Sequence, residues 1–216
     1  MKKTILIAAA IIMIANVSKA QNNDTETRSK LVFGGKVGAN LSNVYDAQGQ
    51  DFKASPKFGL AAGGFIAIPI GKFIGVQPEV LFSQKGFQST GSILGSSYNF
   101  SHTTNYIDVP LLFAFKPSEF FTILAGPQYS YLLSQKDVFT NGSLTTSQQQ
   151  QFKNDNARKN TLCFTGGIDI TIKHIVIGAR VGWDLQTNNG DGTSSNPRYK
   201  NVWYQATIGF RLYGNN

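Results

Sequence analysis

The sequence has one cysteine, few charged residues and, beyond its first twenty residues, no long apolar run. A single cysteine, Cys163, excludes an intramolecular disulfide, so an exported form of this chain depends on its fold for stability. Charged residues make up 15% of the chain, against roughly a quarter in typical soluble domains, so a water-exposed surface would be unusually poor in charge. A transmembrane helix needs about 20 apolar residues, so any membrane role beyond the first twenty residues requires strands.

The first twenty residues have the pattern of a secretory signal peptide. Lys2 and Lys3 precede an apolar stretch over residues 5–15, and the small residues Ser18 and Ala20 suit a cleavage site. The alternative is an anchor that remains attached, but a stretch this short falls below the roughly 20 residues that a helical span requires. The sequence therefore predicts a signal peptide over residues 1–20 that is cleaved after Ala20.

The chain that follows the predicted cleavage site is nearly balanced in charge. Removal of residues 1–20 leaves 17 basic and 12 acidic residues, and the basic ones form no stripe. Nucleic-acid binding, which needs a strongly basic surface, is therefore not expected. Residues 21–30 are polar and charged, and this composition predicts a disordered lead-in.

Beyond residue 30 the chain alternates apolar and polar residues with a period of two. Phe33 and Val37 share one face of the first predicted strand, whereas Lys36 and Asn40 lie on the other. The same alternation predicts eight strands, at residues 31–42, 57–68, 73–86, 105–116, 120–134, 161–172, 175–186 and 202–213.

The connections between these strands alternate in length. Tight turns are predicted at 69–72, 117–119 and 173–174, and long loops rich in Ser, Thr, Asn, Gln and Gly at 43–55, 88–104, 135–160 and 187–201. An even number of antiparallel strands with this alternation is typical of outer-membrane barrels. The predicted fold is all-β, an eight-stranded antiparallel up-and-down transmembrane β-barrel over residues 31–213, with short periplasmic turns and long extracellular loops.

A soluble lipocalin-type barrel also alternates, with its apolar set inside, so the polar face decides between the two. That face carries mostly Gly, Ala, Ser, Thr and Gln with isolated charges of both signs, which suits a narrow filled lumen better than a surface in water. Six charged residues are predicted to form a network in this lumen: Lys36, Glu79, Asp108, Asp169, Arg180 and Arg211. A plug of ion pairs and a selectivity filter for a solute path both fit such a network.

Aromatic residues gather toward the two ends of the predicted strands, as the girdles at the two bilayer interfaces do. Phe33, Phe115, Phe121 and Phe210 are expected near the short turns, and Tyr129, Tyr131, Trp183 and Tyr204 toward the long loops.

Pro78, Pro110 and Pro127 fall inside strands, where each removes a backbone donor, so bulges are predicted at these positions.

Five blocks of the sequence together carry a family resemblance. The chain resembles the PorT-like outer-membrane β-barrel proteins of Bacteroidota at VQPEVLFSQKG (76–86), NYIDVPLLFAF (105–115), ILAGPQYSYLL (123–133), IGARVGWDL (177–185) and YQATIGFRL (204–212). The resemblance implies a barrel in the outer membrane of a Gram-negative bacterium. The namesake's association with a protein secretion apparatus implies, as one alternative, an accessory subunit of such a machine.

No motif indicates catalysis or metal binding. Ser101, His102 and Asp108 are the right residue types for a nucleophile, a base and an orienting group, but adjacent residues of an extended segment point in opposite directions. The loop at 188–196 has oxygen donors without the carboxylate spacing of a calcium site. The sequence therefore predicts a protein that is not an enzyme and has no metal or cofactor.

The expected function is that of a small outer-membrane barrel with a filled polar lumen, acting structurally or through its extracellular loops in partner binding, adhesion or envelope integrity. An accessory role in secretion or assembly and a small-solute channel are the alternatives. The expected partners are outer-membrane lipid and lipopolysaccharide and an envelope protein. The polar and weakly basic residues 145–159 indicate an exposed solvated loop, with contact to lipopolysaccharide phosphates or a partner protein as the alternative.

Overall fold

A computed structural model describes six segments of the chain: residues 27–46, 54–93, 96–141, 144–150, 157–188 and 199–213. The predicted signal peptide and most of the predicted lead-in lie outside these segments. In the described end of the lead-in, Thr27–Ser29 form a 3₁₀ turn. The described segments contain no helix that is long and apolar enough to cross a membrane.

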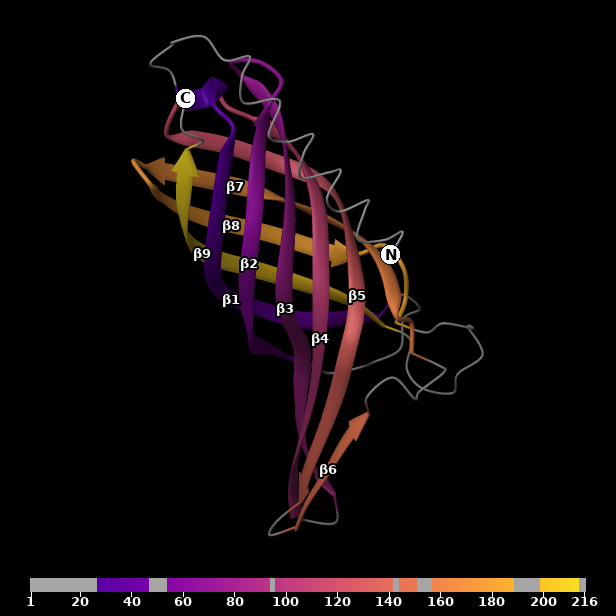
Figure 1. Ribbon diagram of the computed structural model, residues 1–216. Helices are drawn as coiled ribbons and strands as arrows, with labels where there is room; N and C mark the ends of the chain where they lie inside the picture. The colour runs from indigo at the N-terminus through magenta and orange to yellow at the C-terminus, as the bar shows by residue number, and fades with distance from the viewer. Residues whose placement is uncertain are drawn as a thin grey trace, which may run out of the picture.

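Nine antiparallel strands make up the fold in the described segments, and eight of them close into a ring. In chain order they are β1 (Val32–Asp46), β2 (Ser55–Pro69), β3 (Ile74–Ile93), β4 (Ser96–Phe115), β5 (Phe121–Asn141), β6 (Leu144–Gln150), β7 (Asn160–Ile172), β8 (Ile175–Asp184) and β9 (Tyr199–Tyr213). Each strand pairs with the next around the ring, β5 pairs with β7 past β6, and β9 pairs with β1 to close it. The predicted eight-stranded up-and-down barrel is confirmed (Figure 1).

The barrel wall has an apolar outer face and a polar inner face. On β4, Leu111 is 54% exposed, whereas its neighbour Leu112 is fully buried, and the alternation continues along β5, β7 and β8. Most of the large apolar side chains of the strands are exposed on the outside, and most of the polar and charged ones are buried within. Such a surface would be unfavourable in water but suits lipid, so the barrel is oriented as a membrane barrel is.

One end of the barrel has short connections, as the sequence predicts. Three turns join β2 to β3, β4 to β5 and β7 to β8, at residues 70–73, 116–120 and 173–174. The 3₁₀ turn of the lead-in docks at this end, where Arg28 donates to the carbonyl of Pro117 and lies over the ring of Phe73. Composition does not reveal these contacts between the lead-in and the turns.

The other end differs from the prediction, because much of two predicted loops is strand. The predicted loop 88–104 is a hairpin, with Ile93 of β3 opposite Ser96 of β4, and part of the predicted loop 135–160 extends β5 and adds β6. The strands β3, β4 and β5 thus continue beyond the rim of the barrel and, with β6, form a four-stranded sheet that we call the projecting sheet (Figure 1). Seven residues at about 3.3 Å each give β6 a length of about 23 Å.

The predicted bulges at the three prolines are wrong. Pro78 pairs with Leu111, Pro110 with Gln128 and Pro127 with Phe164, and the register is the same on both sides of each. A proline removes one backbone donor but requires no extra residue, so the neighbouring pairs can keep their register. The register shifts lie elsewhere, between Pro56 and Ala61 in β2 and next to Asn105 in β4.

Candidate functional site

Strands β1, β3, β7 and β8 each contribute one charged side chain to a neutral cluster in the lumen. Lys36 Nζ lies 2.6 Å from Glu79 Oε2, and Arg180 Nη2 lies 2.7 Å from Asp169 Oδ1 and 3.8 Å from Glu79 Oε1. All four side chains are buried. Gln77 joins the two carboxylates, since its amide donates to Glu79 at 2.9 Å and to Asp169 at 3.4 Å. Two cations and two anions balance one another, which a lumen without bulk water requires.

One nitrogen of the Arg180 guanidinium is held by a hydrogen bond to the backbone. Its Nη1 donates to the carbonyl of Ile168 at 2.7 Å. The Nη2 contact with Asp169 has the distance of an ion pair but not the alignment of a hydrogen bond, and Nε has no hydrogen-bond partner among the described residues. The cluster is therefore held mainly by charge, and loss of one member would leave its partners uncompensated.

A second charged layer lies nearer the long-loop end. Lys85 Nζ lies 3.0 Å from Asp108 Oδ2, and Ser130 donates to the same carboxylate at 2.6 Å. The ammonium also lies 3.6 Å from the centre of the Trp203 ring and 4.9 Å from that of Tyr106. Lys85 and Trp203 are both 1% exposed. The aromatic faces and the carboxylate together offset the loss of water around this lysine.

Asp184 belongs to the same layer. Its carboxylate accepts from the backbone and the side chain of Asn201 at 2.9 and 2.6 Å, and the Cys163 thiol donates to it at 3.1 Å. Between the two charged layers, Asn40 connects β9 to β3, because it accepts from Gln205 and donates to Ser83, both at 2.9 Å. Polar side chains thus fill the lumen continuously from one charged layer to the other.

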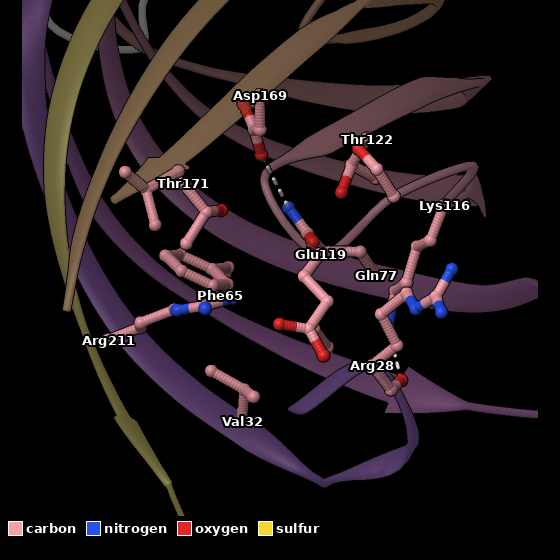
Figure 2. Close-up of a pocket in the computed structure, with 13 residues that line it drawn as sticks. Arg28, Val32, Phe65, Gln77, Lys116, Glu119, Thr122, Asp169, Thr171 and Arg211 are labelled. Atoms are coloured by element: carbon pink, nitrogen blue, oxygen red, sulfur yellow. Dashed lines mark hydrogen bonds between the residues drawn. The ribbon is translucent and has the colours of Figure 1, made fainter. Parts of the chain in front are cut away.

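An apolar cluster of Val32, Phe65, Ala67 and Val176 narrows the short-turn mouth of the lumen. A cavity of about 30 Å³, which these four residues help to line, has room for about two water molecules. Arg211, which the sequence places in the charge network, instead lies at this mouth, where its Nε donates to the carbonyl of Lys173. Figure 2 shows Glu119 pointing into the same space as Arg211. Arg211 lies near the end of β9, which ends at Tyr213, and it lines this cavity together with Gln77 and Asp169.

The rings of Phe87, His102 and Tyr199 pack together at the long-loop mouth of the lumen. His102 lies between Asp137, which contacts Nδ1, and the Tyr199 hydroxyl, 3.1 Å from Nε2. The ring of Phe87 packs on His102 and Tyr199 with centroid distances of 5.1 and 5.5 Å. Ser101 faces the opposite side of β4, and the partner of Asp108 is Lys85, so the structure does not bring together the three residue types considered for catalysis.

The aromatic residues named from the sequence lie on the outer face of the barrel. Phe33, Phe115, Phe210, Tyr129, Tyr131 and Tyr204 are exposed, and Phe121 and Trp183 are half-buried. Exposed aromatics at the strand ends and turns that the sequence does not assign to a girdle include Phe58, Phe73 and Phe120. Lys85 and Asp184 are also unpredicted members of the lumen network, although the alternation places both on the inner face.

Comparison with protein families matches residues 19–211 to the outer membrane protein beta-barrel domain. Comparison with curated proteins gave no match. Among solved structures, the attachment invasion locus protein of Yersinia pestis is 14% identical, with 85% of this chain and 99% of that chain covered and a TM-score of 0.46. Neisserial surface protein A is 8% identical, with 83% and 97% covered and a TM-score of 0.47. OprG of Pseudomonas aeruginosa is 12% identical, with 87% and 98% covered and a TM-score of 0.42.

These structural similarities are too low to carry information about function. The family match spans nearly the whole barrel, and it agrees with the closed strand ring and the apolar outer face described above. It also gives the location, the outer membrane of a Gram-negative bacterium. The chain is a member of the outer membrane protein beta-barrel domain family.

Proposed function

We propose that the barrel is a closed anchor that displays the projecting sheet outside the cell, and that this sheet binds a partner protein. The observation that carries the proposal is the free edge of β6. In the part of the chain that the structure describes, β6 pairs with β5 alone. An unpaired strand edge presents main-chain donors and acceptors that an extended segment of another protein can bind.

The edge of β6 lacks the features that usually block strand addition. Its sequence, LTTSQQQ, has no charged residue and no proline, and its register with β5 runs without a bulge from Asn141 opposite Leu144 to Gln135 opposite Gln150. Thr145 and Ser147 are exposed. The sheet is therefore built in a way that leaves the edge open to a partner.

A second copy in the same membrane fits this edge poorly. Antiparallel pairing of two β6 strands would require the two barrels to point in opposite directions along the membrane normal, whereas copies in one membrane point the same way. The partner that the edge fits is an extended segment of a different protein.

Export through a cleaved signal peptide, which the pattern of residues 1–20 supports, is part of the same proposal.

The packing of the lumen supports an anchor rather than a channel. Two charged layers, a polar layer between them and the side chains that narrow its mouths occupy the lumen, and eight strands leave an interior only wide enough for side chains. A second candidate function, as an accessory subunit of a secretion or assembly machine of Bacteroidota, rests on the resemblance to PorT-like proteins.

A photocrosslinking experiment tests the proposal. A photoreactive phenylalanine at Thr145 or Ser147, on the edge, is expected to form an adduct of discrete mass in intact cells. The same group at Leu111, on the lipid-facing wall, and at Asn99, in the middle of the projecting sheet, is expected to give none of that adduct. If the adduct is a subunit of a secretion machine, the second candidate is favoured.

Absence of an adduct at both edge positions would contradict partner binding through β6. The purified protein is also expected to give no ionic conductance in a planar bilayer. Stepwise conductance would show that the lumen is open and would contradict the closed anchor.

A further inference from the structure

A patch of four hydrogen-bonding side chains lies on the outer face of the wall, just beyond the apolar band at the long-loop end. We call it the anion patch; it consists of Lys57, Ser101, Thr103 and Lys136. Ser101 and Thr103 share one face of β4 and alternate with the buried His102. The face on which Ser101 and Thr103 lie continues down the strand through lipid-facing residues such as Val109 and Leu111.

Three strands contribute to the patch. Lys136 of β5 is directly opposite Thr103 in the register, so the two side chains are neighbours on one face. Lys57 comes from β2 at its register shift, and its ammonium reaches β4, where Nζ lies 2.7 Å from Ser101 Oγ and also donates to Thr103 Oγ1. Lys136 lies close enough for its charge to act on that of Lys57.

The hydrogen bonds within the patch leave several donors that can bind a negatively charged ligand. A hydroxyl that accepts from an ammonium keeps its own proton to donate elsewhere, so Ser101 and Thr103 present O–H donors. Lys57 has a third N–H, and Lys136 adds a second positive charge. Asp137 also acts on Lys57, but its carboxylate contacts His102, whose side chain is buried on the other face of the sheet. Several donors and two cations within one patch match the oxygens of a phosphate.

The position of the patch identifies the source of the phosphate. Phe58, next to Lys57, is 74% exposed, as an aromatic at the edge of the apolar band would be. That band is about 25 Å tall in outer-membrane barrels, and lipid headgroups lie immediately beyond it. The long-loop end faces outward in such barrels, so the patch meets headgroups of the outer leaflet.

We propose that the anion patch binds a phosphate group of an outer-leaflet glycolipid, the chemistry found in lipopolysaccharide. The site differs from residues 145–159, for which the sequence offers this contact as an alternative to a solvated loop. It is also separate from the edge of β6, so its failure and that of the proposed function are distinguishable.

A binding measurement on the full-length protein in detergent tests this site. The probes are lipopolysaccharide, enzymatically dephosphorylated lipopolysaccharide and inorganic phosphate. Wild-type protein is expected to bind lipopolysaccharide at least about tenfold more tightly than the Lys57→Gln/Lys136→Gln variant does, because the variant lacks both cations that would pair with the phosphate. Dephosphorylation is expected to produce a similar loss for wild-type protein. Lys72→Gln/Lys173→Gln, which removes two lysines from the turns of the opposite rim, is the matched control and should bind like wild type.

Heat-modifiable migration on a gel verifies that each variant forms a folded barrel. Equal affinity of the double variant and wild type, or equal affinity of wild type for the two lipids, would overturn the proposal. Displacement of the lipid by millimolar inorganic phosphate would overturn the assignment to a lipid, because the site would then serve a free phosphate.

Discussion

The Glu79→Gln variant is expected to lose about 3–5 kcal/mol of unfolding free energy at neutral pH. The substitution keeps the shape of the side chain but removes one of the two carboxylates that face Lys36 and Arg180. Two buried cations would then share Asp169 alone. Urea unfolding of the protein in phospholipid vesicles, followed by tryptophan fluorescence, measures the change.

Two further variants separate charge balance from loss of packing. Glu119→Gln makes the same chemical change at an exposed position near the short-turn mouth and should cost less than about 0.5 kcal/mol. The Lys36→Met/Glu79→Gln double variant removes one charge of each sign and should be more stable than Glu79→Gln alone. If Glu79→Gln costs no more than Glu119→Gln, water rather than the protein compensates the lumen charges.

The Leu111→Arg variant is expected to lose about 2–4 kcal/mol, the cost of a cation at the bilayer midplane on the lipid face of a barrel. Leu111 lies midway along the apolar outer face of β4 and is 54% exposed. Asn99→Arg, on the same strand but in the projecting sheet, should change the unfolding free energy by less than about 0.5 kcal/mol. The same unfolding assay compares the two variants, and equal effects would place Leu111 in water.

The fold is largely predictable from the sequence because two simple signals agree. The period of two identifies the inner and outer faces, so alternation alone assigns Glu79 and Arg180 to the lumen and Phe113 to the outside. The alternation of short and long connections then indicates an up-and-down barrel in a membrane. Neither signal depends on which residues meet across the lumen.

The projecting sheet is not predictable because its strands are rich in Ser, Thr, Asn and Gln. A segment such as SSYNFSHTTN (96–105) has the composition of a loop, and only main-chain pairing with β3 and β5 makes it strand. The partners in the lumen are unpredictable for a similar reason. Lys85 meets Asp108 and Trp203 through the register of three strands, and that register is a long-range property of the closed ring.

Arg211 and the prolines show the limits of alternation in another way. Alternation gives the face of a strand on which a residue lies but not its height along the barrel, so it cannot distinguish the mouth, where Arg211 lies, from the charged cluster. The sequence predicts a bulge wherever a proline removes a backbone donor. The strand pairs nevertheless keep their register at all three prolines. In a closed barrel, the pairs on either side of a proline hold the strand in place.

The orientation of the wall can be tested with the two tryptophans that the chain contains. Trp183 is half-buried on the outer face, whereas Trp203 is 1% exposed inside the lumen. In vesicles containing nitroxide-labelled lipid, the Trp203→Phe variant, which retains only Trp183, should lose several-fold more fluorescence than the Trp183→Phe variant. Equal quenching of the two variants by lipid, or strong quenching of Trp203 by aqueous iodide, would contradict an apolar wall in lipid around a closed polar lumen.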